Sequence, residues 1–383
     1  MIPYARQSIG QAEAAAVIEV LASDFLTQGP VVPRFEERLA AFCGATHAVA
    51  VSNATSALHI AVRALGLSAG GRLWTSPNSF VASSNCALYC GAQVDFVDVD
   101  PRTYNMSVPL LARKLEDAQN AGRLPDVVVA VDFAGQPCEL DALAELRAQY
   151  GFRIVEDASH AVGARYREAR IGSGAYADVT VFSFHPVKIV TTAEGGMALT
   201  GDVKVAQTMQ LLRSHGITRD PQLMTGAPEP WEYEQVMLGF NYRLTEIQAA
   251  LGVAQMDRIE SFLARRRAIA ARYDAELAHL PLVLPYHLPH VQPAYHLYPV
   301  QVSPASPLNR RELYDRLQAG GIAANVHYRP IYLQPYYRNL GFERGHCPNA
   351  EAYYARALSL PMYPGLSDEE QDRVIDVLSA ALR

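Results

Sequence analysis

The stretch Val127-Val-Val-Ala-Val-Asp132, followed by Leu140–Tyr150 and then by Arg153-Ile-Val-Glu156, decides the fold expected for this chain. Two β-branched runs separated by a helix-like segment predict two parallel strands, because a parallel connection needs a long crossover, usually a helix. The same alternation runs from about residue 46 to 200 and predicts a largely parallel sheet with helices on both faces. The other strands are expected at Ala48–Val51, Gln93–Val99 and Val179–Phe184, and the other helices at Ser56–Leu65 and Ala82–Tyr89.

A capping-box sequence, Thr245-Glu-Ile-Gln248, begins a long amphipathic stretch that reaches roughly Leu280. We interpret this stretch as the connector from a large domain, residues 1–250, to a smaller C-terminal α/β domain, residues 251–383. That division leaves open that the N-terminal segment packs on the small domain. In the small domain we expect a strand at Leu297–Val302, a helix from Asn309 to Gly320, a strand near Ile322–Val326 and a last helix after Ser367.

Composition excludes several classes of function. The 383 residues carry a formal net charge of −6, which provides no basic field for a nucleic-acid backbone or an anionic membrane. No apolar stretch approaches the ~20 residues that span a bilayer, and Met1–Val17 lacks the order of a secretory signal, so we expect a cytoplasmic location. The five cysteines are scattered, and Cys86 and Cys90 lack a second pair that would complete a zinc site. We therefore expect core cysteines and no metal site.

Lysine is rare in this chain, which makes each lysine informative. Only three of the 33 basic residues are lysines, and Lys114 and Lys204 have polar neighbours. Lys188 instead lies in the apolar run Val181-Phe-Ser-Phe-His-Pro-Val-Lys-Ile-Val190, where a free ammonium would be costly. A lysine whose stem packs while its head reaches solvent stays an alternative.

Three other motifs follow predicted strands. The hydroxyls of Ser52-Asn-Ala-Thr-Ser56 and the free N–H groups of a first helical turn converge where a phosphate can bind, although a plain N-cap has the same pattern. Asp157 follows the strand Arg153–Glu156, at the edge where parallel sheets bind ligands; the alternative is that it caps the next turn. Tyr295-His-Leu-Tyr298 and His327-Tyr328 are ambiguous between core and rim.

Together these signals fit one cofactor. Pyridoxal phosphate needs an anchor for its phosphate, a carboxylate for its pyridine nitrogen and an amine that condenses with its aldehyde. The first helical turn after Ser52, the carboxylate of Asp157 and the amine of Lys188 supply these three parts, so the sequence predicts a site for pyridoxal 5'-phosphate.

Three longer motifs carry a resemblance to a known family. Asp157-Ala-Ser-His160, Ser183-Phe-His-Pro-Val-Lys188 with Glu194-Gly-Gly196, and Gly239-Phe-Asn-Tyr-Arg243 are similar to the motifs of the DegT/StrS nucleotide-sugar aminotransferases. That family has the aspartate-aminotransferase type I fold, with a large, mainly parallel domain and a smaller C-terminal α/β domain. Within it, the chain most resembles the UDP-4-keto-sugar aminotransferases of the pseudaminic acid pathway, through Phe25-Leu-Thr-Gln-Gly29, Arg213-Ser-His-Gly-Ile217 and Val326-His-Tyr-Arg-Pro330.

The resemblance implies a role for each site residue. Lys188 would bond to the cofactor and shuttle the proton, Asp157 would hold the pyridine nitrogen, Phe80 would stack on one ring face, and His160 would lie near the other face or the phenolic oxygen. The expected phosphate ligands are Thr55, Ser56 and Ser183, with Asn241 contributed by the second subunit of a homodimer. The expected substrate contacts are His185, Arg219, His327 and Tyr328.

The implied reaction is transfer of the amino group of L-glutamate to a UDP-linked 4-keto-6-deoxy-N-acetylhexosamine. The substrate of choice is UDP-2-acetamido-2,6-dideoxy-β-L-arabino-hexos-4-ulose. Some related sugar dehydratases carry histidine in place of the lysine, so Lys188 favours transamination. Three alternatives stay open: an aminotransferase for another nucleotide-linked 3- or 4-keto sugar, a pyridoxal-phosphate-dependent dehydratase, and a regulatory relative without turnover.

Overall fold

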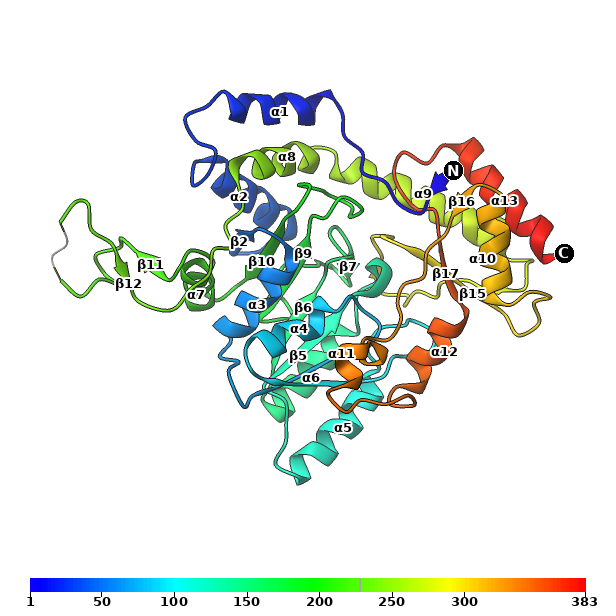
Figure 1. Cartoon of the computed structure of the whole chain (residues 1–383), viewed down its shortest axis with the longest axis horizontal. Helices are drawn as coiled ribbons and strands as arrows, with labels where there is room; N and C mark the ends of the chain where they lie inside the picture. The colour runs from blue at the N-terminus through cyan, green and yellow to red at the C-terminus, as the bar shows by residue number, and fades with distance from the viewer. Residues whose placement is uncertain (227–228) are drawn as a thin grey trace.

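A seven-stranded sheet forms the centre of the computed structural model, which describes residues 1–226 and 229–383 (Figure 1). In spatial order its strands are β2 (His47–Val51), β10 (Gly196–Thr200), β9 (Val179–Ser183), β6 (Arg153–Asp157), β5 (Val127–Val131), β3 (Arg72–Thr75) and β4 (Gln93–Phe96). All neighbours from β9 to β4 pair in parallel, whereas β10 is antiparallel to both β2 and β9. The prediction of a mainly parallel sheet is confirmed.

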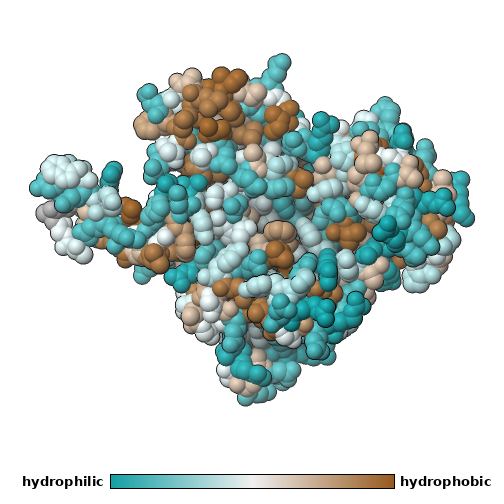
Figure 2. Space-filling model, viewed as in Figure 1, coloured by the Kyte–Doolittle hydropathy of each residue, from teal (hydrophilic) through white to brown (hydrophobic). Residues whose placement is uncertain are grey.

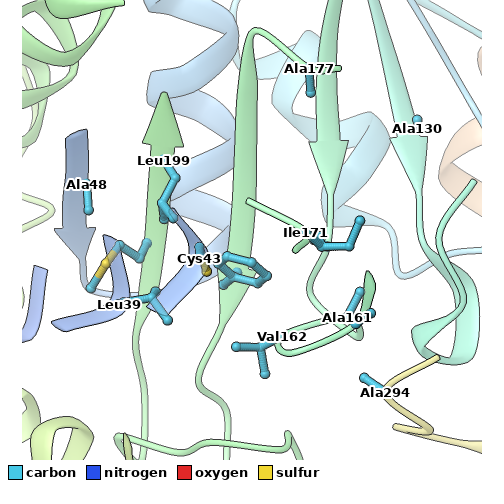
Figure 3. Close-up of a cluster of buried hydrophobic side chains, with 14 of the residues drawn as sticks. Leu39, Cys43, Ala48, Ala130, Ala161, Val162, Ile171, Ala177, Leu199 and Ala294 are labelled. Atoms are coloured by element: carbon cyan, nitrogen blue, oxygen red, sulfur yellow. The ribbon is translucent and has the colours of Figure 1, made fainter. Parts of the chain in front are cut away.

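The two faces of the sheet bury separate sets of side chains, because successive residues of a strand point to opposite faces. On β5, Val128 and Ala130 belong to one core, whereas Val127, Val129 and Val131 belong to the other. Figure 3 shows part of the first core, where Leu39 and Cys43 lie beside Leu199. The helices that contribute to the first core are α2 (Val31–Cys43), α5 (Val108–Asn120), α6 (Leu140–Tyr150), α8 (Glu246–Met256) and α9 (Ile259–Leu277). Those that contribute to the second core are α3 (Ala54–Ala64), α4 (Ala82–Tyr89) and α7 (Val203–Arg213).

The C-terminal region forms a third core. A sheet of order β13-β15-β17 packs with α9 and with two further helices. The elements are β13 (Leu282–Val283), α10 (Arg310–Ala319), β15 (Tyr298–Val302), β17 (Ala357–Leu360) and α13 (Asp368–Leu382). The N-terminal β1 (Ile2–Pro3) pairs with β16 (Ile322–Ala323), so the chain start packs on this region. The expected strand to Val326 is shorter because residues 325–328 turn into a cavity. The domain boundary at residue 250 stays a prediction.

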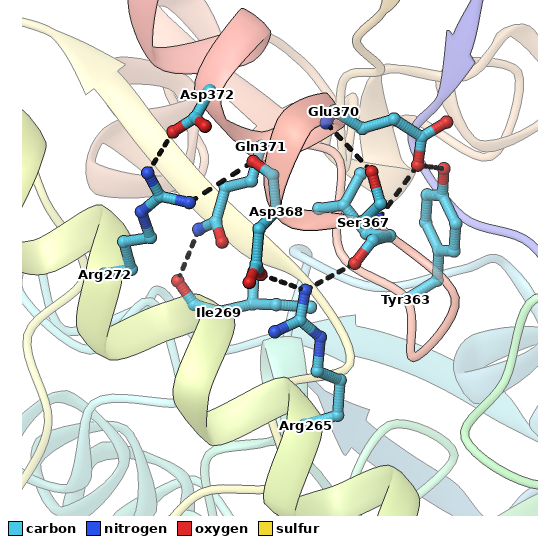
Figure 4. Close-up of polar contacts among 10 residues, drawn as sticks. Arg265, Ile269, Arg272, Tyr363, Ser367, Asp368, Glu370, Gln371 and Asp372 are labelled. Carbon is cyan, nitrogen blue, oxygen red and sulfur yellow. Dashed lines mark hydrogen bonds and ion pairs between the residues drawn. The ribbon is translucent and has the colours of Figure 1, made fainter.

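The capping box expected after Ser367 is present at the start of α13. The Ser367 hydroxyl accepts a hydrogen bond from the Glu370 N–H at 3.1 Å, and the Glu370 carboxylate accepts one from the Ser367 N–H at 3.0 Å (Figure 4). From α9, Arg265 pairs with Asp368 at 2.8 Å. The first turn of α13 is therefore fixed both by its own cap and by the helix on which it packs.

The amphipathic stretch from Thr245 to Leu280 is two helices, α8 and α9, rather than one. The Thr245 capping box is present, but the helix ends at Met256 and the next begins at Ile259. At the break, the Arg258 guanidinium donates to the Glu13 carboxylate at 2.8 Å and to the Ser8 backbone carbonyl at 3.3 Å. Because these partners come from the distant N-terminal segment, tertiary contacts set the break.

The remaining elements connect these layers. They are α1 (Gln11–Leu21), η1 (Phe133–Gly135), β7 (Arg165–Tyr166), β8 (Ala169–Arg170), β11 (Ile217–Thr218), β12 (Glu234–Gln235), β14 (Val291–Gln292), η2 (Ile331–Leu333), α11 (Pro335–Arg338) and α12 (Pro348–Arg356). The five cysteines are buried and free, as expected. Within residues 1–226 and 229–383, no helix is long and apolar enough to cross a membrane. A cytoplasmic location stays a prediction.

Two exposed features stand out from the body. Figure 1 shows α1 lying along α8, and Figure 2 shows a broad hydrophobic area over it. We call this area the N-terminal apolar patch, made of the exposed residues Ile9, Ile18, Leu21, Phe25 and Leu26. The β11–β12 arm projects from the body beside α7 (Figure 1) and exposes Trp231, Tyr233 and Leu238. Contiguous apolar surface of this kind is typical of protein interfaces.

Candidate active site

A cavity of about 1060 Å³ opens at the carboxyl ends of β6 and β9, beside the N-terminus of α3. In parallel sheets this edge is the usual place for a ligand. Ten of the twelve predicted site residues line it: Thr55, Ser56, Phe80, Asp157, His160, Ser183, His185, Lys188, His327 and Tyr328. The topology thus brings together motifs that lie up to 273 residues apart, from Thr55 to Tyr328.

Lys188 lies in the turn between β9 and β10, where its N–H donates to the His185 carbonyl at 2.9 Å. Its side chain reaches the cavity, and desolvation lowers the pKa of its amine to about 8, with the Asp157 carboxylate acting in the opposite direction. At neutral pH about one Lys188 amine in ten is therefore unprotonated, far more than for a lysine with the ordinary pKa. The residue is half-buried at the cavity, so its amine is not fully exposed to solvent.

Asp157 is the last residue of β6, and both of its carboxylate oxygens are held. Oδ2 accepts from the Ser83 hydroxyl at 2.6 Å, and Oδ1 accepts from the Ser159 hydroxyl at 2.6 Å and from the Ser159 N–H at 3.2 Å. The alternative interpretation is thus partly correct, because Asp157 does cap the following turn. The same bonds fix its carboxylate at the cavity wall.

The N-terminus of α3 has the features of a phosphate site. Asn53 caps the helix by accepting from the Ser56 N–H at 2.9 Å, and the hydroxyls of Ser52 and Ser56 lie 3.2 Å apart. A Cβ on Gly196 would lie 2.5 Å from the Ala54 nitrogen, so only glycine lets β10 approach this turn so closely. The N-cap and phosphate interpretations are compatible, because Thr55 and Ser56 both line the cavity, although the Ser56 hydroxyl also donates to Asn53 Oδ1 at 3.1 Å.

A cluster of aromatic and imidazole rings covers the opposite side of the cavity. His160 Nδ1 accepts from the Ala134 N–H at 3.3 Å, and its Nε2 lies 3.3 Å from the Tyr328 hydroxyl. The ring centroids of His160 and His296 are 4.3 Å apart. Burial, with Lys188 as a nearby charge, lowers the pKa of His327 to about 3 and the pKa of His160 and of His296 well below the ordinary value. The imidazoles are therefore neutral at physiological pH.

Two predicted residues lie outside the cavity lining within this one chain. Asn241, in the loop after β12, forms an isolated β-bridge with Ser214. Arg219 follows β11 on the projecting arm. Phe80 lines the cavity with 61% of its surface exposed, as a ring free to stack on a ligand would be. The contribution of Asn241 to a second subunit's site stays a prediction, as does the role of Arg219.

Several lining residues were not predicted as site residues. Tyr4, Ser159, Tyr242, His296, Asn325 and Arg329 also face the cavity, and Ser83 supports it from behind. Ser159 lies within the motif Asp157–His160 and Arg329 within Val326–Pro330, so both could have been predicted as site residues. Nothing in the local sequence around Tyr4 or Ser83 distinguishes them from ordinary residues. In the part of the chain that the structure describes, no group of three or more histidine, cysteine or acidic side chains is placed to hold a metal ion.

Fold and site together define the class of protein. An amine with a lowered pKa suits covalent bonding to an aldehyde, a fixed carboxylate suits a protonated pyridine nitrogen, and a helix N-terminus with hydroxyls suits a phosphate. On a parallel sheet with a smaller C-terminal α/β region, these features are those of a pyridoxal-phosphate-dependent enzyme of fold type I.

Comparison with known proteins gives the family. The model of the DegT/DnrJ/EryC1/StrS aminotransferase family matches residues 7–379, and the chain belongs to this family. It is 35% identical to the UDP-4-amino-4,6-dideoxy-N-acetyl-β-L-altrosamine transaminase of Campylobacter jejuni, over 100% of this chain and 98% of that protein.

Two solved structures are similar over their whole length. Helicobacter pylori PseC, an aminotransferase involved in pseudaminic acid biosynthesis, has a TM-score of 0.90 and 30% identity, covering 100% of this chain and 99% of that one. Spr1654 from Streptococcus pneumoniae, in its PMP form, has a TM-score of 0.90 and 31% identity with the same coverage. The predicted family, fold class and cofactor, pyridoxal 5'-phosphate, are confirmed, and the chain is a sugar aminotransferase.

Proposed function

We propose that the chain transfers the amino group of L-glutamate to the C4 keto group of UDP-2-acetamido-2,6-dideoxy-β-L-arabino-hexos-4-ulose, as a step of pseudaminic acid biosynthesis. The observation that carries the aminotransferase chemistry is the Lys188 amine, with its lowered pKa, in the same cavity as the fixed carboxylate of Asp157. Support for the substrate is the full-length similarity to two enzymes whose names place them in this chemistry.

Lys188 and Asp157 carry out the central steps in this proposal. When bound, pyridoxal phosphate supplies an electrophilic aldehyde and a ring that withdraws electrons. The Lys188 amine would hold the cofactor, and its Nζ, when free, would accept and return the substrate proton. The Asp157 carboxylate, which Ser83 and Ser159 keep oriented, would hold the protonated ring nitrogen.

The other cofactor contacts position the ring. Phe80 would pack on one face and His160 would lie near the other face or the phenolic oxygen. His160 Nδ1 accepts from the Ala134 N–H, so its proton is on Nε2, the nitrogen nearest Tyr328. The hydroxyls of Thr55 and Ser56 at the N-terminus of α3, and that of Ser183 at the end of β9, would hold the phosphate.

The sugar nucleotide occupies the rest of the cavity, along His185, His327 and Tyr328. Of these residues, His327 offers a hydrogen bond without charge, since burial lowers its pKa to about 3. Arg219, on the β11–β12 arm, supplies a cation for the diphosphate from outside this chain's own cavity. Such an assignment requires the arm to reach the site of a second copy.

We infer a homodimer with shared active sites. The N-terminal apolar patch and the apolar residues of the β11–β12 arm are both exposed in the single chain, with Ile18 64% and Trp231 73% accessible. Burying these side chains against a second copy is favourable at about 25 cal/mol per Å² of apolar surface. A two-fold arrangement would place each chain's Asn241 at the partner's phosphate site.

Product identification tests the substrate assignment. Purified protein with bound cofactor should be yellow and should be bleached by L-glutamate. It is then given a panel of UDP- and dTDP-linked keto sugars. We expect a new amine at C4 of a product that keeps its UDP and 2-acetamido groups. Amination only at C3, or preference for dTDP sugars, would assign another substrate. Turnover without consumption of glutamate would indicate a dehydratase, and binding without turnover a regulatory protein.

Mixed dimers test the shared site. Lys188→Ala and Asn241→Glu are each expected to be inactive, and the two are unfolded and refolded together. In a heterodimer one site carries both lesions and the other neither, so about half of the heterodimer sites recover activity. Absence of recovery in a preparation shown to contain heterodimers would contradict the contribution of Asn241 to the partner's site.

A further inference from the structure

His296 is the most enclosed ring at the cavity, and neither fold-level similarity nor the roles proposed above explain it. Its side chain is 2% exposed and lines the cavity, although Tyr295 and Leu297 on either side belong to other packing clusters. Its Nδ1 is buried without a hydrogen-bond partner among the residues that the structure describes. A buried nitrogen without a hydrogen-bond partner destabilises the folded protein. Hydrogen bonding by Nδ1 therefore does not explain the presence of a histidine at this position.

The backbone on both sides of His296 is held in place by a second short segment, η1. The Ala294 N–H donates to the Gly135 carbonyl at 2.9 Å, and the Leu297 N–H donates to the Ala134 carbonyl at 3.3 Å. The Ala134 N–H is the donor to His160 Nδ1. One turn of η1 therefore fixes the main chain around His296 and the ring of His160 at the same time.

A buried arginine holds the same segment from the other side. Arg266 of α9 is 1% exposed and donates to the carbonyls of Tyr295 at 3.0 Å, His296 at 3.3 Å and Met362 at 3.0 Å. Its pKa is lowered to about 9 by burial. Burying a guanidinium whose partners are carbonyls and no carboxylate is unfavourable in free energy. The position of the segment around His296 is therefore maintained despite this unfavourable contribution.

The backbone conformations point the same way. Ala134 has φ 58° and Tyr295 has φ 51°, both in the left-handed region that non-glycine residues rarely adopt. Gly135, with φ 95°, lies so close that a Cβ there would be 2.8 Å from the His160 carbonyl and 3.0 Å from the His296 nitrogen. Strained residues of this kind cluster where a structure fixes a functional group.

Resting on the function proposed above, we infer that His296 is a positioning residue, which fixes the His160 ring against the cofactor by packing on it in a tilted contact. The ring centroids lie 4.3 Å apart with an interplanar angle of 46°. Desolvation lowers the pKa of both rings and keeps them uncharged; the charge of Lys188 acts in the same direction on both, and that of Arg266 on His296. His296 acts through His160 and transfers no proton itself.

Two variants separate packing from chemistry. His296→Ala removes the ring and leaves a void under His160, whereas His296→Phe keeps a flat, uncharged ring of similar size. The matched control is His290→Ala. The His290 ring also packs on an aromatic side chain, Tyr166, at 5.0 Å and also has a buried nitrogen without a partner, but it lies outside the cavity lining.

The measurements are made on the full-length protein: the dissociation constant of pyridoxal phosphate, the visible circular dichroism of the bound cofactor, and the pH profile of kcat/KM for glutamate. We expect His296→Ala to weaken cofactor binding about ten-fold or more and to reduce the dichroism, because a loosened ring loses its orientation. His296→Phe should lie within about three-fold of wild type, and neither variant should shift the pH profile.

The following outcomes for the His296 variants would contradict the positioning role. Cofactor binding by His296→Ala equal to that of His290→Ala would remove the positioning role. Loss of binding in a folded His296→Phe, or a shifted pH profile, would assign the role to a ring nitrogen instead; the Phe variant decides this even if the Ala variant does not fold. Wild-type protein that is not bleached by glutamate would contradict the proposed function, a failure that does not depend on His296.

Discussion

Replacing Ser83 by alanine tests the support of the central carboxylate. The Ser83 hydroxyl donates to Asp157 Oδ2 at 2.6 Å, and Ser83 is completely buried, so water cannot take its place. A hydrogen bond to a charged group contributes about 1.5–3 kcal/mol. If half of this is expressed as cofactor affinity, at about 1.4 kcal/mol for each factor of ten, the Kd for pyridoxal phosphate rises about three- to ten-fold.

The neighbouring serine provides a matched control. Ser84 is also completely buried on α4, but its hydroxyl lies 2.6 Å from the Tyr337 hydroxyl and makes no contact with Asp157. Ser84→Ala should lower the free energy of unfolding by about 1 kcal/mol and leave cofactor affinity unchanged. Both variants are assayed by titrating the apoprotein with cofactor, followed in the visible spectrum, and by urea unfolding.

The difference in cofactor affinity between the two variants tests whether Ser83 orients Asp157. Ser83→Ala should weaken cofactor binding relative to Ser84→Ala at comparable loss of stability. If the two variants bind the cofactor equally well, Ser83 has no share in orienting Asp157, and the hydrogen bond serves the fold alone.

Three further outcomes are expected. Lys188→Ala should fold but lose the visible band of the bound cofactor and all turnover; a visible spectrum of this variant like that of wild type would contradict the mechanism. Wild-type activity should rise as the pH approaches about 8, where the Lys188 amine loses its proton. His327 has a pKa of about 3 in the folded protein, compared with an ordinary pKa of 6.5. Between pH 3 and pH 6.5 only the unfolded chain binds this proton, so the free energy of unfolding falls on acidification by up to about 1.4 kcal/mol per pH unit. His327→Gln should therefore give a shallower dependence of the urea midpoint between pH 4.5 and 6.5, and an unchanged slope would contradict the burial of a neutral ring. Gly196→Ala should destabilise the protein by about 1–3 kcal/mol and weaken phosphate binding, because the new Cβ meets the Asn53–Ala54 backbone; normal cofactor affinity in this variant would count against the phosphate site.

The parts of the site that could be predicted from the sequence depend on local patterns. Runs such as Val127–Val131 identify buried strands; Asp157 ends such a strand, and Asn53–Ser56 lie just beyond the end of another. Lys188 was recognisable because an apolar run rarely contains a lysine. Each of these signals lies within a few residues of the group it identifies, so a single sequence is enough to find it.

The parts that could not be predicted depend on packing between distant segments. Ser83 is 74 residues from Asp157, and its contact exists only because α4 packs over the end of β6. Similarly, the break between α8 and α9 contains no glycine or proline and is determined by Arg258 reaching Ser8 and Glu13. Such contacts follow from the three-dimensional arrangement, and no local propensity encodes them.

The antiparallel strand β10 has a consequence for the order in which the protein folds. It is the strand through which β2, and with it the turn at Asn53 that we propose binds the phosphate, joins the sheet, since Gly196 pairs with Val51 and Thr200 with His47. These pairings close loops of about 145–155 residues, and long loops close late because their entropy must be overcome first. Strands β3 to β6 and β9 can assemble from nearer neighbours while β2 is still undocked. A nascent chain released before Gly196 would therefore have much of its sheet but no cradle for the phosphate, and β2 would be an unpaired apolar segment open to aggregation.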